Sequence, residues 1–293
     1  MAEPGDAIVW KLTLCYDGNP FAGWQRQPGR RTVQGELEGA IARVTGERAA
    51  AQGSGRTDTG VHAMAQVASV ALRSPVPPDN LRRALNHRLP PSIRILAAEH
   101  APPGFHARHS ALRKTYDYRL FRAALCPPWL APYVCAYTFP LATERMQAAA
   151  RAVLGTHDFG SFQAPEPDVS GRAAARATAR GVTEFRKRTA VRTLFQSRWE
   201  MPEPDLLVYR VSGSGFLHHM VRNLVGTFLA VGRGQIAADA LPAILAARSR
   251  SAAGPTAPAS GLWLHSVEYA GRECGQDSDR GAGATLKHPE LPA

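Results

Sequence analysis

The chain has 293 residues and a formal net charge of +11, and 44% of its residues are hydrophobic, so global disorder is excluded and a polyanionic partner is expected. No apolar run approaches the ~18 residues that a membrane span needs, and the first residues lack the basic and then apolar layout of a signal peptide, so we expect no membrane association. The four cysteines are too scattered for a disulfide scaffold and predict a reducing, cytoplasmic location.

The first part of the chain predicts a ferredoxin-like unit. Residues 8–16 alternate in polarity, as a strand does, and Thr32 is a suitable N-cap for a helix with apolar residues at helical spacing. Asp79 is expected to cap a second helix, which closes before Pro90. The expected elements are strand 8–16, helix 33–45, a short strand near 48–55, strand 63–72, a helix from 79 to 89 and strand 92–100. This is the order of a βαββαβ unit.

The second part repeats this order without obvious sequence identity. Its expected elements are strand 114–121, helix 143–154 with Gly155 as a stop, strands 190–200 and 206–212, helix 215–231, a short helix 239–247 and strand 262–270. We therefore predict an α+β fold of two pseudo-related ferredoxin-like halves, whose sheets join around a central cleft. The halves are expected over 8–110 and 111–270.

Two stretches stand apart from these elements. An insertion is expected over 164–192, and its part from 170 to 192 holds seven basic residues against one acidic residue, Glu184. It reads either as a basic arm for a polyanion or as a solvated insertion without a role. The stretch 271–293 lacks periodicity and is expected to be a flexible tail.

The string GSGRTDTGVHA, residues 53–63, is the strongest candidate for chemistry. It lies between two expected strands, and its glycines allow the backbone to turn tightly or approach a ligand. It lacks the lysine of a P-loop and the strand-to-helix setting of a dinucleotide fingerprint. On pattern alone, Asp58 is either a turn former or a functional carboxylate.

Several strings together resemble the tRNA pseudouridine synthase A family, in which the pattern RTDxGVHA surrounds a nucleophilic aspartate. They are RTDTGVHA (56–63), YDGNPFAGWQRQP (16–28), TVQGELEGAI (32–41), FHARHSA (105–111), KTYDYRL (114–120), GTHDFGSF (155–162), the long string at 213–234 and GLWLHSVEY (261–269). The resemblance covers about residues 8–270. The chain departs from the family in its Arg-rich insertion and at Thr115, where the family often has a basic residue.

The resemblance implies an isomerase that converts uridine to pseudouridine at positions 38–40 of the tRNA anticodon stem-loop. It implies tRNA as the partner, a homodimer, and no metal or organic cofactor. Two other classes stay open: a non-catalytic RNA-binding protein of the same fold, and a nucleoside hydrolase that uses a carboxylate near the sugar. Only the isomerase rejoins the base through its C5 atom.

The resemblance also implies roles for four residues. Asp58 matches the catalytic aspartate, and Arg222 the arginine that pairs with it. Tyr116 matches the tyrosine that stacks on the target uracil, with a hydroxyl able to give or take a proton. Arg56 matches the residue that fills the space left by the extruded nucleotide. The alternatives are a backbone contact for Arg56, a phosphate or surface contact for Arg222, and a core position for Tyr116.

The remaining candidates are weaker. Arg26 is a candidate phosphate ligand because of its positive charge, and the nearby Trp24 and Phe21 are expected either to pack in the core or to contact the edge of the RNA. The histidines 62, 218 and 219 have no standard metal-site spacing with Asp58, and His62 is expected to be structural. Cys15 is expected to be buried without a nucleophilic role.

Overall fold

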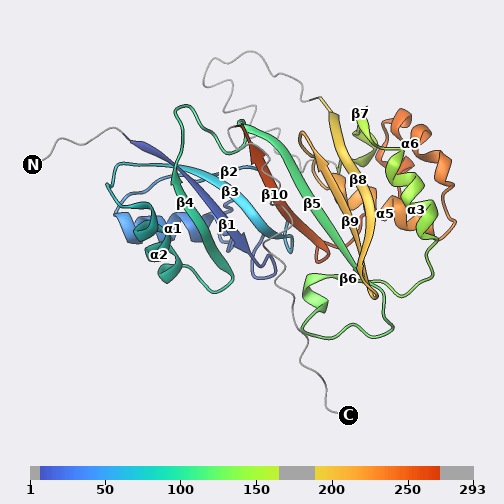
Figure 1. Ribbon diagram of the computed structural model, residues 1–293, viewed down its shortest axis with the longest axis horizontal. Helices are drawn as coiled ribbons and strands as arrows, with labels where there is room; N and C mark the ends of the chain where they lie inside the picture. Colours follow the sequence, from blue (N-terminus) through green and yellow to red (C-terminus); the bar gives the residue numbers. More distant parts are fainter. Residues whose placement is uncertain (1–6, 165–188, 271–293) are drawn as a thin grey trace, which may run out of the picture.

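The computed structural model describes residues 7–164 and 189–270 (Figure 1). Most of the predicted insertion at 164–192 and the whole of the predicted tail at 271–293 therefore lie outside the described residues. Within the described part, no helix is both long and apolar enough to span a membrane.

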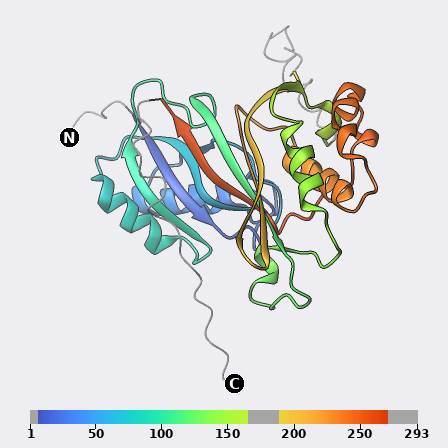
Figure 2. The ribbon, with the colours of Figure 1, turned by 45° about the vertical axis from the view of Figure 1, so that its right-hand side comes forward.

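One mixed sheet runs through the molecule, in the order β4-β1-β3-β10-β5-β9-β8-β7, with β2 paired to β3 and β6 to β5. The strands are β1 (Ile8–Tyr16), β2 (Gln52–Gly53), β3 (His62–Leu72), β4 (Ile93–His100), β5 (Ala111–Phe121), β6 (Cys135–Ala136), β7 (Gly155–Asp158), β8 (Val191–Glu203), β9 (Leu206–Gly213) and β10 (Leu262–Tyr269). Figure 2 shows how these strands twist across the molecule.

The strand order confirms the predicted fold class. The first half reads β4-β1-β3-β2 and the second reads β10-β5-β9-β8, so both halves place their four principal strands in the same spatial order. The halves join where β10 pairs in parallel with β3, through Trp263 opposite His62 and Leu264 opposite Ala63. The division into separate units at residue 110 stays a prediction.

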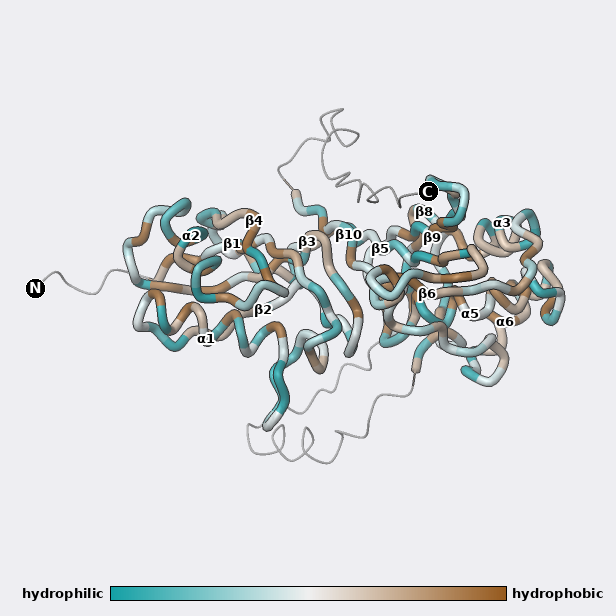
Figure 3. The backbone as a smooth tube through the Cα atoms, turned by 90° about the horizontal axis from the view of Figure 1, so that it is seen from below, coloured by the Kyte–Doolittle hydropathy of each residue, from teal (hydrophilic) through white to brown (hydrophobic). Residues whose placement is uncertain are grey.

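The helices form two groups, one at each end of the sheet. They are α1 (Val33–Thr45) and α2 (Pro78–Arg88) in the first half, and α3 (Thr143–Arg151), α5 (Met220–Gly232) and α6 (Leu241–Ala247) in the second. In Figure 3 the two groups lie at opposite ends of the long axis, with β3, β10 and β5 between them. Buried apolar side chains from both halves form one core.

Local chemistry accounts for the element boundaries. The side chain of Thr32 accepts a hydrogen bond from Gly35 N at 3.2 Å, so α1 begins at the predicted cap, and Gly46 ends it with φ 74°. The prediction for Asp79 was wrong, because the N-cap of α2 is Pro77 and the carboxylate lies in the first turn. Gly155, predicted to stop a helix, begins β7 with φ 93°, and α3 has ended earlier.

Three other predictions need correction. The strand near 48–55 is reduced to the two residues of β2. Helix α5 starts at Met220 rather than at 215, because His219 adopts a left-handed conformation that a helix cannot contain. Cys15 is half-buried rather than buried, since strand alternation puts it on the face opposite Trp10 and Leu12.

Candidate active site

The loop that carries Asp58 connects β2 to β3 and packs backbone-to-backbone against the loop after β1. A Cβ at Gly18 would lie 2.2 Å from the carbonyl oxygen of Val61, and a Cβ at Gly23 would lie 2.6 Å from that of Thr57. Gly23 also has φ 83°, which a side chain disfavours. The glycines after β1 therefore allow the close contact that fixes the Asp58 loop.

A buried glutamine holds the beginning of the same loop. Gln66 of β3 donates from its side-chain amide to the carbonyl oxygen of Gly55 at 3.0 Å, and it accepts a hydrogen bond from the Ser54 hydroxyl at 2.6 Å. Lys114 of β5 donates to the carbonyl oxygen of Ser54. Burial lowers the pKa of Lys114 to about 8, and two nearby arginines act in the same direction.

Sequence reasoning missed both of these supporting residues. Gln66 is a fully buried polar residue within a mostly apolar strand, AMAQVASVAL, and this contrast was an available signal. Lys114 had no such signal, because its contact with Ser54 joins positions 60 residues apart.

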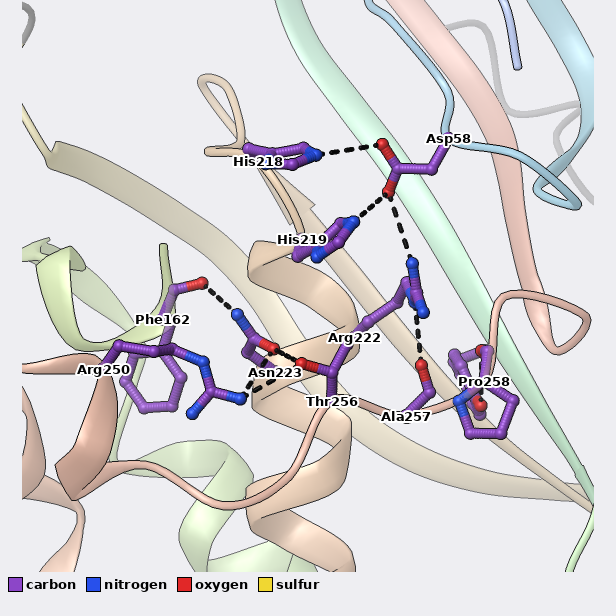
Figure 4. Close-up of polar contacts among 11 residues, drawn as sticks. Asp58, Phe162, His218, His219, Arg222, Asn223, Arg250, Thr256, Ala257 and Pro258 are labelled. Atoms are coloured by element: carbon purple, nitrogen blue, oxygen red, sulfur yellow. Dashed lines mark hydrogen bonds and ion pairs between the residues drawn. The ribbon is translucent and has the colours of Figure 1, made fainter. Parts of the chain in front are cut away.

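The side chain of Asp58 faces three residues at the N-terminal end of α5 (Figure 4). Its Oδ2 atom lies 3.6 Å from Arg222 Nη1 and 3.3 Å from His219 Nε2, and its Oδ1 atom lies 3.5 Å from His218 Nε2. The structure thus brings Asp58 and Arg222 to ion-pair distance from the two halves of the chain. The Asp58 side chain is 26% exposed, so a substrate can reach it.

The two adjacent histidines come together through an unusual backbone. His219 has φ 59° at the N-cap of α5, and the His218 and His219 rings lie 4.0 Å apart. Burial lowers the pKa of His219, while the Asp58 carboxylate opposes this shift. The ligand atoms of Asp58 and both histidines lie within 4.8 Å of one another, a group that could hold a metal ion. The sequence spacing did not predict this convergence.

Arg222 is held from behind by the segment before β10. Its Nε atom donates to the carbonyl oxygen of Ala257 at 2.8 Å. The neighbouring Asn223 is fully buried, donates to the Phe162 carbonyl oxygen at 2.8 Å and accepts a hydrogen bond from the Thr256 hydroxyl at 2.6 Å (Figure 4). These bonds fix both the helix and the segment, so the guanidinium has a defined direction.

Tyr116 of β5 lies beside this group. Its ring makes an edge contact with Phe216, with centroids 5.0 Å apart, and 7% of the residue is exposed. Burial raises the pKa of Tyr116 far above its usual value, with a further contribution from Asp58, so the hydroxyl is neutral at pH 7. Tyr118, on the same strand face, is fully buried and donates to the Pro258 carbonyl oxygen at 2.9 Å, as expected for a core residue.

The other predicted residues lie around this centre. Arg56 is exposed and forms no ion pair within the described residues. Arg26 is 71% exposed, with Nη1 3.4 Å from Glu38 Oε2, so its charge is partly compensated. Phe21 and Trp24 are each 2% exposed, which favours packing over an RNA contact.

His62 is structural, as expected. Its Nδ1 atom accepts a hydrogen bond from Gly18 N at 3.1 Å, and its Nε2 atom lies 3.1 Å from the carbonyl oxygen of Pro132. The ring stacks on Trp263 with centroids 4.4 Å apart. His62 therefore ties the loop after β1 to the junction between the halves, and it is not part of the group around Asp58.

Comparison with known proteins places this chain in a family. The family model described as tRNA pseudouridine synthase matches residues 14–110 and 149–270. A protein named tRNA pseudouridine synthase A from Solibacter usitatus is 48% identical over 88% of this chain and 98% of its own length. Proteins of the same name from Halalkalibacterium halodurans and Maridesulfovibrio salexigens are 42% and 40% identical, over 86% and 92% of this chain and 89% and 94% of their own lengths.

The chain belongs to the tRNA pseudouridine synthase family, and it is an isomerase of the pseudouridine synthase type. The crystal structure of a Cbf5–Nop10–Gar1 complex is only distantly similar: the alignment covers 75% of this chain and 54% of that chain, with a TM-score of 0.28 and 12% identity.

Proposed function

We propose that Asp58 is the carboxylate with which this protein converts uridine to pseudouridine in tRNA. The observation that carries the proposal is the pairing of Asp58 with Arg222, 3.6 Å apart, at a partly exposed position between the two halves. A carboxylate can act on a glycosidic bond as a nucleophile or by stabilising an electron-deficient sugar. Three routes are open for the reaction: attack on C1′ of the ribose, attack on C6 of the uracil, and a route through a glycal. All three use the carboxylate of Asp58.

The surrounding residues support this role through their charge and position. A bound base excludes water from Asp58, and the Arg222 guanidinium, 3.6 Å away, supplies a compensating positive charge there. Tyr116 supplies an aromatic ring that can stack on uracil. Its hydroxyl is neutral, so it has a proton to donate in the rearrangement. Arg56, exposed two residues before Asp58, is free to occupy the space of an extruded nucleotide.

The substrate position and the assembly belong to the same proposal. We infer that the uridines are those at positions 38–40 of the anticodon stem-loop, that the enzyme works as a homodimer, and that it acts in the cytoplasm. The net charge of +11 supports a tRNA partner, because phosphate contacts supply much of the affinity for nucleic acid. Mapping pseudouridine in tRNA before and after incubation tests the positions, and sedimentation tests the dimer.

One assay detects the isomerisation directly and distinguishes it from RNA binding alone and from nucleoside hydrolysis. tRNA labelled with tritium at C5 of uridine releases label to water when the base is rejoined through C5. A binding protein releases nothing, and a nucleoside hydrolase releases free uracil instead.

Asp58→Ala is expected to abolish tritium release while tRNA is still bound. The control is Asp79→Ala, which removes an exposed carboxylate that pairs with Arg82 at 3.4 Å and should change nothing. Full release by Asp58→Ala would refute the proposal.

A further inference from the structure

Two imidazoles converge on the Asp58 carboxylate, although a carboxylate with one arginine suffices for the proposed reaction. His218 Nε2 faces one carboxylate oxygen at 3.5 Å and His219 Nε2 faces the other at 3.3 Å. All three ligand atoms lie within 4.8 Å of one another. We call Asp58, His218 and His219 the histidine–aspartate trio.

The separations within the trio match those around a tetrahedral metal ion. Zinc binds imidazole nitrogen and carboxylate oxygen at about 2.0–2.2 Å, and in a tetrahedron this places neighbouring ligand atoms about 3.3–3.6 Å apart. Each contact of Asp58 with a histidine falls in this range, at Oδ1 for His218 and at Oδ2 for His219, so an ion would engage the carboxylate as a whole. The two imidazole rings lie side by side with centroids 4.0 Å apart, and all three ligand atoms lie within 4.8 Å of one another.

The trio is also accessible. The side chains of His218, His219 and Asp58 are 33%, 26% and 26% exposed, so an ion can enter from solvent and a water molecule can complete the fourth position. Two imidazoles with one carboxylate suit zinc and its neighbours in the transition series, whereas magnesium prefers oxygen ligands. Because two of the three ligands are imidazole nitrogens, we expect the trio to bind zinc in preference to the magnesium that accompanies tRNA.

We propose that the histidine–aspartate trio binds one zinc ion, and that the bound ion inhibits the isomerase by engaging the carboxylate of Asp58. Zinc binding follows from the trio alone, whereas the inhibition rests on the proposed function of Asp58. The ion competes with Arg222 for the carboxylate of Asp58. Metal binding and uridine isomerisation are then mutually exclusive at one site.

Replacing Arg222 tests the zinc site, because the proposal predicts the direction in which the zinc affinity changes. Its guanidinium, 3.6 Å from Asp58, repels any cation that enters the trio. Arg222→Gln removes that repulsion, and we expect zinc to bind about tenfold more tightly to this variant than to the wild-type protein. A variant that merely disturbed the local structure would bind zinc more weakly, so a tightening is specific to the proposal.

Binding is measured by titrating zinc chloride into the full chain without tRNA in a calorimeter, with cobalt(II) as a spectroscopic probe. We expect one site per chain, visible d–d bands of a tetrahedral cobalt ion, and no thiolate charge-transfer band.

His218→Ala and His219→Ala should each weaken zinc binding at least about tenfold, as the loss of one ligand predicts. His87→Ala removes a lone exposed histidine of α2 and should leave binding unchanged. Unchanged binding in either trio variant, or a thiolate band, would overturn the site.

Inhibition is measured by tritium release from tRNA at rising zinc concentration with magnesium held constant. We expect zinc to inhibit over the concentrations at which calorimetry shows binding, and a chelator to restore activity. Zinc bound at the trio with undiminished tritium release would overturn the inhibition while leaving the site in place. Tritium release by Asp58→Ala would instead refute the role of Asp58, so the two failures are distinguishable.

Discussion

Gly226 of α5 lies directly against the carbonyl oxygen of Pro255, so close that a Cβ on Gly226 would be 1.6 Å from this atom. This approach brings the segment before β10 onto the helix and places the Ala257 carbonyl oxygen at Arg222. We expect Gly226→Ala to push the segment away, to lower the free energy of unfolding by about 1–3 kcal/mol and to reduce tritium release. Urea denaturation and the isomerase assay measure the two effects.

Gly39 of α1 is the control for this substitution. It is also a helical glycine, but the atom nearest to its Cβ position belongs to the flexible Arg43 side chain, at 3.4 Å. Gly39→Ala should therefore stabilise the protein by about 0.5–1 kcal/mol, the usual gain of alanine over glycine within a helix. Equal effects at both positions would contradict the argument from close approach.

Arg222→Lys tests whether the direction of the guanidinium matters beyond its charge. Lysine keeps the positive charge but has no Nε donor for the Ala257 carbonyl oxygen, so the cation is no longer fixed toward Asp58. We expect kcat for tritium release to fall by about 10- to 100-fold with a smaller change in KM, because the lost interaction serves the reacting carboxylate. A pure increase in KM would instead indicate a role in tRNA binding.

Gln66→Leu tests the support of the Asp58 loop. Leucine leaves the carbonyl oxygen of Gly55 and the hydroxyl of Ser54 without their buried partner, and a lost buried partner costs about 1–3 kcal/mol. We expect reduced stability together with reduced kcat. A variant that is destabilised but keeps full kcat when folded would show that Gln66 does not position Asp58.

Lys114 predicts a pH dependence of stability. Its pKa is lowered by burial from 10.5 to about 8 in the folded protein, so the unfolded chain binds more protons between these values. Stability from this group therefore rises as the pH increases from about 8 to 10.5. The difference in unfolding free energy between the wild-type protein and Lys114→Met should shift in favour of the wild type over this interval. A constant difference would contradict the lowered pKa.

The basic insertion predicts a salt-dependent contribution to tRNA affinity. Deleting 172–188 removes six basic residues and one acidic residue, so tRNA should bind more weakly and with a smaller salt slope. Filter binding at several salt concentrations measures both quantities. Deleting 277–293, an equally long stretch without excess positive charge, is the control. Equal affinity and slope in both deletions would favour an insertion without a role.

Local signals predicted the fold well where they were complete. Helix α1 has the predicted bounds because Thr32 caps it and its apolar residues keep helical spacing to the end. Helix α5 was predicted five residues too early, because the apolar pattern continues through a loop that ends at His219 in a left-handed conformation. The periodicity of apolar residues predicts which face of an element is buried, but it does not predict the left-handed backbone conformation of one residue such as His219.

The site was predictable only in part, for a related reason. The family strings identified Asp58 and Arg222, and the fold brings them to ion-pair distance. The polar contacts of Gln66 and Lys114, and the convergence of His218 and His219, depend on how distant strands and loops pack. Residue spacing along the chain carries no information about such contacts.

The junction between β3 and β10 has a consequence for biosynthesis. Strand β10 is the last strand of the described chain, yet it fills the place between β3 and β5 in the middle of the sheet. A nascent chain that has not yet emerged beyond residue 262 leaves the flank of β3 open to pairing with any other extended peptide. The flank of β3 is therefore covered only after residues 262–269 have been synthesised. We expect a chain that stalls on the ribosome before this point to be prone to aggregation.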